Sequence, residues 1–173
     1  MITLLVDRAT LMNAPQALRI EDLPFALAMR DEPLIFAAVG AIHLLGVALL
    51  VGTIVAFDLR VLGLNRSLSL RSLARHLLPL ALASMVLIVP TGLAMFATRA
   101  SDLLLDGMFS AKIGLIFAHG LLALAFHLGP FRSVNEWDIE IHPPIAAKAC
   151  AIASLLGWIC VLVLGRFVAT STV

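Results

Sequence analysis

Two histidines, His43 and His119, lie inside long apolar stretches of the chain, where an imidazole is uncommon. No charged side chain occurs in residues 34–57 or in residues 113–131. If both stretches cross a membrane in the same direction, counting from their centres places the two rings at depths that differ by roughly 1 Å. Imidazoles that face each other across a helix bundle can hold a haem iron. The pair therefore predicts one haem b, with His43 and His119 as its axial ligands.

The residues around this pair suit a flat, anionic cofactor. Gly40 and Gly46 lie three residues before and after His43, so all three share one helical face with a shallow trough beside the ring. Arg99 and Lys112 are expected at the outer ends of their spans, where they could pair with haem propionates. Three alternatives stay open: another cofactor, a proton pathway, or glycines and histidines that only pack and hydrogen-bond helices together.

A second histidine pair, His76 and His127, could hold a second haem near the inner side. Their expected depths differ by about 10 Å, which is too much for ligands of one haem unless the second span is shifted or broken at Pro79. Copper is the competing metal, because Met29, Met95 and Met108 are expected near His43 and thioethers with imidazole suit copper. Methionine is also ordinary filler in apolar helices.

The composition indicates a membrane protein. Hydrophobic residues make up 61% of the 173-residue chain and charged residues only 13%, far from the balance of a soluble domain. Four apolar stretches approach the ~20 residues that a helix needs to cross the hydrocarbon core. The predicted fold is an all-α integral membrane four-helix bundle over residues 34–173, with its spans at 34–57, 77–98, 113–131 and 145–165.

The chain before the bundle and the loops within it predict the topology. Residues 1–33 form an expected polar tail with a short interfacial amphipathic helix around Leu23–Met29. The connection between the first two spans is rich in arginine, so the positive-inside rule places it in the cytoplasm and both termini outside. We expect the bacterial cytoplasmic (inner) membrane. Within the first connection, Asp58 and Arg60 are expected to make a helix cap and an interfacial pair, with a proton-handling Asp58 as the alternative.

Several function classes are disfavoured. The net charge of +1 argues against nucleic acid as a partner. The chain has no Ser-His-Asp set, no phosphate-binding glycine loop and no paired carboxylates within a span, so a hydrolase or a nucleotide-driven pump is not expected. An electron-transfer subunit therefore fits better than a stand-alone enzyme.

The stretch Ala38–Leu64, AVGAIHLLGVALLVGTIVAFDLRVLGL, resembles small uncharacterised bacterial four-span membrane proteins with an H-L-L-G…D-L-R-x-L-G-L signature. Leu77-Leu78-Pro79, Thr91-Gly92 and Lys112 fit the same pattern, and the resemblance covers most of residues 30–130. It implies the fold but no secure activity. The layout also looks distantly like cytochrome b561-type and copper-resistance membrane proteins, from which only His43 and His119 carry over as ligands.

The leading interpretation is a membrane-embedded b-type cytochrome or haem-bearing subunit that transfers electrons within a larger redox complex. A quinone or an outer redox protein would be its electron partner. An alternative from another class is a non-redox accessory subunit that stabilises a larger membrane assembly, and a copper-handling membrane protein comes third. In each case the expected partners are lipid and other membrane protein subunits.

Overall fold

The computed structural model describes residues 20–170, so most of the expected tail, residues 1–19, lies outside the described residues. The regular elements in the described part are all helices, which confirms the all-α fold class. They are α3 (Pro24–Asp31), α4 (Pro33–Leu62), α5 (Leu70–Ala97), α6 (Ala100–Leu105), α7 (Gly107–Leu128), the 3-10 helix η1 (Pro130–Glu136) and α8 (Ile145–Thr170).

Four helices are long and apolar enough to cross a membrane: α4, α5, α7 with η1, and α8. This supports an integral membrane protein. Each of them extends beyond its expected span at one end or both. α4 continues through Asp58 and Arg60 to Leu62, where Gly63 ends it with a φ of +114°, a left-handed conformation that glycine adopts without strain. α5 begins at Leu70, because the Ser69 hydroxyl accepts a hydrogen bond from the Ser72 N–H and caps it.

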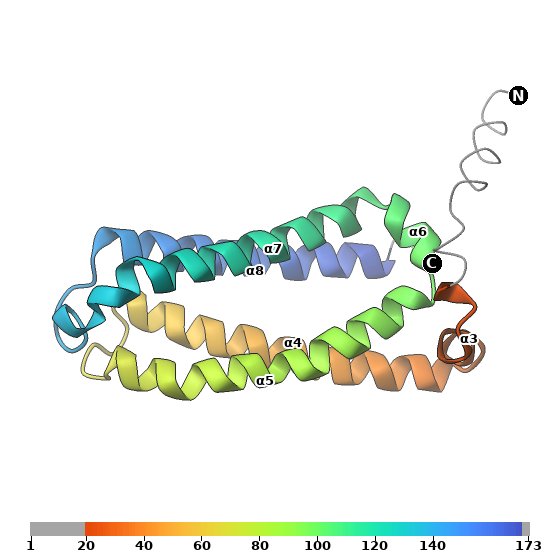
Figure 1. The fold of residues 1–173 in the computed structure, drawn as a ribbon, viewed down its shortest axis with the longest axis horizontal. Helices are drawn as coiled ribbons and strands as arrows, with labels where there is room; N and C mark the ends of the chain where they lie inside the picture. Colours follow the sequence, from red (N-terminus) through yellow and green to blue (C-terminus); the bar gives the residue numbers. More distant parts are fainter. Residues whose placement is uncertain (1–19, 171–173) are drawn as a thin grey trace, which may run out of the picture.

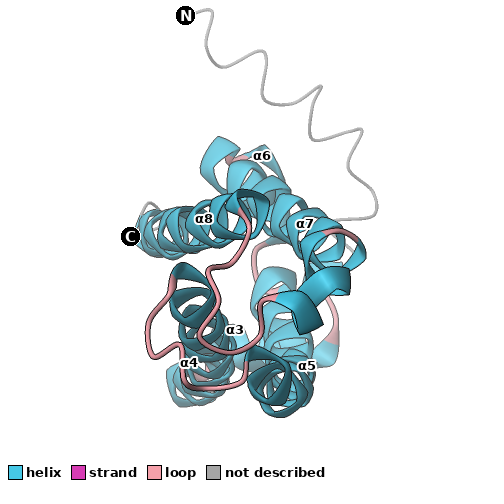
Figure 2. Cartoon of the chain, turned by 90° about the vertical axis from the view of Figure 1, so that its left-hand side faces the viewer, coloured by secondary structure: helices cyan, strands magenta, loops and turns pink. Residues whose placement is uncertain are grey.

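The four spans form two hairpins. α4 packs against α5, and α7 packs against α8, while the hairpins meet mainly along α4 and α8. Figures 1 and 2 show this arrangement along and down the bundle. α5 and α7 make no comparable contact with each other. At most 17% of the residues in the apolar window of any span are buried, so most apolar faces are left for lipid or for other protein helices.

α5 changes direction in its C-terminal half, where Pro90 lies (Figure 1). Proline has no N–H to donate within the helix, and its ring crowds the preceding turn, so a bend at this point is expected. The helix continues across both Pro79 and Pro90 without interruption. α5 is therefore bent near Pro90, and it is not broken at Pro79.

The short helix α3 closes the end of the bundle where the hairpins begin. Its Arg30 guanidinium donates to the Thr98 carbonyl at 2.8 Å and lies 3.8 Å from Glu21. Glu21 also accepts a hydrogen bond from the Ser101 N–H. These contacts attach the expected interfacial helix to α5 and α6.

Arg60 organises the opposite end of the bundle. This side chain is only 2% exposed, and its guanidinium donates to the backbone carbonyls of Leu68 at 2.6 Å, Arg66 at 3.1 Å and Asp138 at 2.5 Å. It therefore joins the end of α4 to the loops on both sides. The expected pair of Asp58 with Arg60 is wrong, because Arg60 bonds to carbonyls and Asp58 faces other helices.

Replacing Arg60 by alanine should leave three carbonyls without their donor. Hydrogen bonds to a charged group contribute about 1.5–3 kcal/mol each in net terms, so we expect Arg60→Ala to lower the unfolding free energy by about 3 kcal/mol. Thermal unfolding in detergent measures this. The exposed Arg75, replaced in the same way, serves as the control; an equal effect of both substitutions would contradict the role given to Arg60.

The Asp138 carboxylate ties the 137–144 loop to α5. Partial burial on its own raises the pKa of Asp138, but hydrogen bonds from the Arg71 N–H and the Ser69 hydroxyl outweigh it. With the nearby Arg60 charge, they lower this pKa below its ordinary value of 3.8. Because the folded-state pKa is depressed, the charged carboxylate stabilises the fold above pH 3.8, and this contribution is lost as the pH falls through the lowered pKa.

We therefore expect the melting-temperature difference between the wild type and Asp138→Asn to be full at neutral pH. It should shrink below pH 3.8 and vanish in stronger acid. Thermal melts at stepped pH measure this difference, with the exposed Asp102→Asn as the comparison. A difference that grows on acidification would refute the assignment.

Candidate functional site

His43 lies at the interface of α4 and α5. Its Nδ1 is 3.0 Å from the Thr91 hydroxyl oxygen, and that hydroxyl donates in turn to the Leu87 carbonyl. The hydroxyl oxygen is therefore free to accept, which places the ring proton on Nδ1 and the lone pair on Nε2. The Ile88 carbonyl is another acceptor near this ring. A neutral imidazole with its Nδ1–H engaged and its Nε2 lone pair available is the form that binds metals.

The glycines near His43 serve close packing of α4 on α5. A Cβ atom on Gly46 would lie 2.9 Å from the Ile88 side chain, and one on Gly92 would lie 3.1 Å from His43 Cε1. A Cβ atom on Gly40 would lie 4.0 Å from the Met95 methyl group. The expected trough along Gly40 and Gly46 is thus filled by residues of α5. Gly46 therefore lets α4 and α5 approach closely, whereas Gly40 has only an ordinary contact, and the role of these glycines beside a cofactor stays a prediction.

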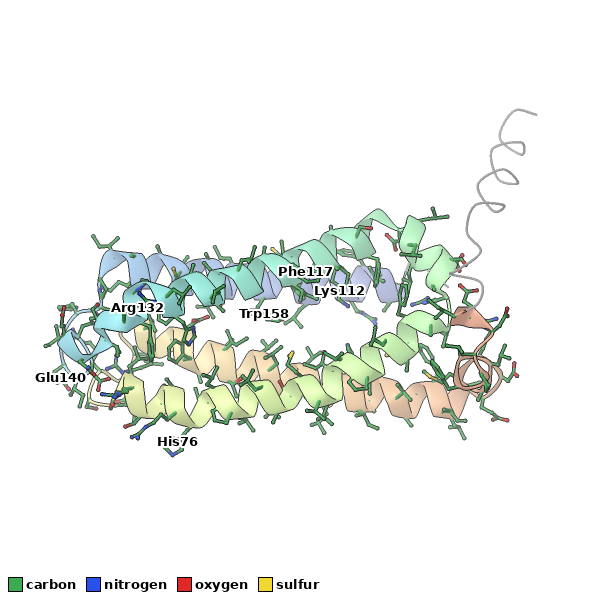
Figure 3. All side chains as sticks on the ribbon, viewed as in Figure 1. His76, Lys112, Phe117, Arg132, Glu140 and Trp158 are labelled. Carbon is green, nitrogen blue, oxygen red and sulfur yellow. The ribbon has the colours of Figure 1, made fainter. Side chains whose placement is uncertain are left out.

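Lys112 is a charged residue that lies within electrostatic reach of His43. The ammonium interacts electrostatically with the His43 ring, and it also lies beside Gly165 of α8, where a Cβ atom would be 3.6 Å from Nζ. Figure 3 shows the Lys112 side chain directed toward the space between the hairpins. No ion pair involves Lys112 in the part of the chain that the structure describes. Arg99 lies at the start of α6, and no contact with His43 is found for it among residues 20–170.

His119 lies at the interface of α7 and α8. Its Nδ1 is 2.7 Å from the Leu115 carbonyl, so Nδ1 donates and Nε2 carries the lone pair. Nε2 is buried and has no hydrogen-bond partner among the described residues. The ring lies on Gly157, where a Cβ atom would overlap Cε1 and Nε2, and its centroid is 5.4 Å from that of Trp158. The glycine therefore makes the room that this imidazole occupies.

Asp58 is buried between helices, and its neighbours differ from those expected from the sequence. Its side chain is only 6% exposed, and its Oδ2 has no hydrogen-bond partner among the described residues. The Ser154 side chain on α8 hydrogen-bonds to the carboxyl group, and His119 on α7 interacts with it electrostatically. The sequence could have excluded the pair of Asp58 with Arg60, because residues two apart on a helix do not face each other.

These contacts fix the depth of the two histidines. On α4, His43 is fifteen residues before Asp58, about 22 Å along the axis. On α8, Gly157 under His119 is only one turn beyond Ser154, the neighbour of Asp58. Counting through Asp58 and Ser154 separates His43 from His119 by roughly 18 Å along the bundle, and counting along α7 from Lys112, the neighbour of His43, gives about 10 Å. The equal depth expected from the sequence is wrong, and the described arrangement does not fit one haem ligated by both rings.

The depth count failed because charged residues were taken as the limits of the spans. Lys112 was placed at the outer end of the third span, but it lies inside the bundle against Gly165 and level with the His43 region. Asp58 likewise lies within α4 and not at its boundary. The centres of the uncharged stretches therefore do not mark one plane of the membrane.

The other predicted metal sites are not assembled in the structure. His76 is exposed and its ring is directed away from the bundle (Figure 3), with Nδ1 bonded to the Ser72 carbonyl of its own helix. His127 is also exposed and bonds to the Ala123 carbonyl. Among residues 20–170, no group of three or more His, Cys, Asp or Glu side chains could hold a metal ion.

The methionines expected near His43 are dispersed. Met29 is a buried residue of α3, Met95 lies beside Gly40 on the α4–α5 interface, and Met108 is exposed. Of the three, Met95 shares the α4–α5 interface with His43, so it is the candidate thioether for a copper site there. It stays a prediction.

Residues 31–171, almost the entire described bundle, match the model of a family of unknown function (DUF6644). The chain belongs to DUF6644. No curated protein and no solved structure matches it. The family match confirms the resemblance to uncharacterised proteins, while the likeness to cytochrome b561-type and copper-resistance proteins has no support from these comparisons. For this DUF6644 protein, the site must therefore be interpreted from its own residues.

The contact of His119 with Gly157 can be tested by filling the space. We expect Gly157→Ala to displace the ring and to lower the unfolding free energy by about 1–3 kcal/mol, as overpacking does. Adding His119→Ala to Gly157→Ala should restore most of the loss. Thermal unfolding in detergent gives the values, and Gly120→Ala on α7, where a Cβ atom meets nothing within 4 Å, is the control. No recovery in the double variant would argue against the contact.

Proposed function

We propose that this DUF6644 protein is an integral membrane electron-transfer subunit that holds one haem b at His43. The observation that carries the proposal is the pairing of two features inside the spans. His43 has its Nδ1–H engaged by Thr91 and a lone pair on Nε2, and Lys112 is an ammonium without an ion-pair partner beside it among the described residues. An iron ligand next to a free cation suits a haem with anionic propionates.

Thr91 and Lys112 have different roles in the proposed site. Thr91 holds the His43 ring in the tautomer whose Nε2 can bind iron, as an outer hydrogen-bond partner does in metal sites. Lys112 would pair with a propionate, which also accounts for an unpaired ammonium within a span. When bound, the haem supplies one-electron redox chemistry. The electron partner would be a quinone or another membrane subunit.

His119 is not assigned to this haem. Its Nε2 lies against Gly157, and roughly 10–18 Å along the bundle separates it from His43. The second haem at His76 and His127 is also not part of the proposal, because both rings are exposed and bonded to their own helices.

An accessory role is the second candidate, and the exposed helix faces favour it. α5 and α7 contact each other far less than the helices of each hairpin do, with Phe96 stacked on Phe109, and large apolar residues such as Leu44, Phe117 and Val86 are exposed. Other membrane subunits could cover these faces within a larger assembly. The bacterial cytoplasmic membrane, with both termini outside, is the proposed location for either role.

The absorbance spectrum of the purified protein, reduced minus oxidised, tests the haem proposal. We expect a b-type α-band that His43→Ala abolishes and that His119→Ala retains. Loss of the band in both variants would restore the bis-histidine interpretation. A wild type without any haem band would refute the cytochrome function and leave the accessory role, unless metal analysis finds stoichiometric copper.

Lys112→Met independently tests the proposed pairing of Lys112 with a haem propionate. Loss of one charge-assisted bond should weaken haem affinity about ten-fold. Haem titration of the apoprotein measures this, with Arg99→Met as the matched control because Arg99 has no described contact with His43. Equal losses in both variants would contradict the placement of Lys112 beside the haem.

A further inference from the structure

A second polar cluster lies well away from His43, where α4, α7 and α8 converge. There Ser154 of α8 hydrogen-bonds to the Asp58 carboxyl group of α4, His119 of α7 interacts with that group electrostatically, and the His119 ring packs on Gly157, one turn beyond Ser154. The proposed haem site does not use these residues. Ionisable side chains within a membrane span are costly, and they mark functional sites when no structural partner explains them.

Two atoms in this cluster are buried without a hydrogen-bond partner among the described residues: Oδ2 of Asp58 and Nε2 of His119. Both are acceptors when the groups are unprotonated, because Nδ1 of His119 already donates to Leu115. The hydrogen bond from Ser154 reaches the carboxyl group but leaves Oδ2 unpaired. The cluster therefore has more acceptors than donors, and one added proton supplies the missing donor.

The charged residues on the surrounding elements do not supply the missing hydrogen-bond donor. Arg60, two residues further along α4, donates to loop carbonyls. α5, which packs on α4, carries no titratable side chain between His76 and Arg99. On α8, Lys148 precedes Ser154 by six residues, about 9 Å along the axis. No ion pair to Asp58 is found within residues 20–170.

We propose that Asp58 and His119 form a proton-binding site within the membrane, assisted by the Ser154 hydroxyl. One proton binds to Oδ2 of Asp58 or to Nε2 of His119, forming an O–H or N–H bond, and its release restores the unprotonated pair. Asp58 is four residues from the end of α4, about 6 Å along the axis, so the proton exchanges with the aqueous phase at the Arg60 end of the bundle.

Infrared spectroscopy of the full chain in lipid nanodiscs tests the site. Haem-free His43→Ala protein serves as the background, so the outcome does not depend on the haem proposal. We expect a carboxylic acid C=O band that shifts in D2O, titrates with pH and disappears in Asp58→Asn. Asp102→Asn is the control, because that aspartate is exposed. A band that survives Asp58→Asn, or one that does not change with pH, would overturn the proposal.

The coupling to His119 distinguishes a shared proton from a buried aspartic acid that is only structural. His119→Gln keeps a polar side chain but removes the titrating ring, and we expect it to move the midpoint of the Asp58 band by about one pH unit or more. Ser154→Ala should move this midpoint to higher pH, because the carboxylate loses a hydrogen-bond donor. An unchanged midpoint in His119→Gln would overturn the shared site, even if Asp58→Asn does not fold.

Discussion

Imidazole rings packed on glycines determine how the helices of this protein meet. His43 lies on Gly92 between α4 and α5, and His119 lies on Gly157 between α7 and α8. In an apolar environment a ring nitrogen cannot rely on water, so each Nδ1 is bonded to a nearby hydroxyl or carbonyl, and the glycine supplies the space for the ring. The hydrogen bond of His43 to Thr91 joins α4 to α5, whereas that of His119 stays within α7 and its ring meets α8 by packing on Gly157.

Because the histidines belong to different hairpins, the interior holds two polar clusters and not one. The first contains His43, Thr91 and Lys112, and the second contains Asp58, Ser154 and His119. The first has an unpaired cation beside a ring with an available lone pair, which favours an anionic metal-bearing cofactor. The second has unpaired acceptors and favours a proton. A membrane redox subunit could use both, since electron transfer within a bilayer is often accompanied by proton uptake.

The fold could largely be predicted, because the residues that form, start and end the helices can be read directly in the sequence. These are the long apolar stretches, the prolines at helix starts and Gly129 at a helix end. α4 starts at Pro33, α7 ends at Leu128 before Gly129, and α8 starts directly after Pro144. The site was predictable only in its residue types. Which rings meet depends on the register between helices, and the charges used to count depth, Asp58 and Lys112, lie inside the bundle. Spacing along one helix carries no information on that register, although it does exclude a pair such as Asp58 with Arg60.

A pair of distances measures the separation of the two histidines most directly. Spin labels can be attached to His43→Cys with Lys112→Cys, and to His43→Cys with His119→Cys, after Cys150 and Cys160 are replaced by serine. Pulsed electron resonance in nanodiscs then compares the two pairs. The structure predicts that position 43 is clearly closer to position 112 than to position 119. A shorter distance from 43 to 119 would contradict it and return the two histidines to one site.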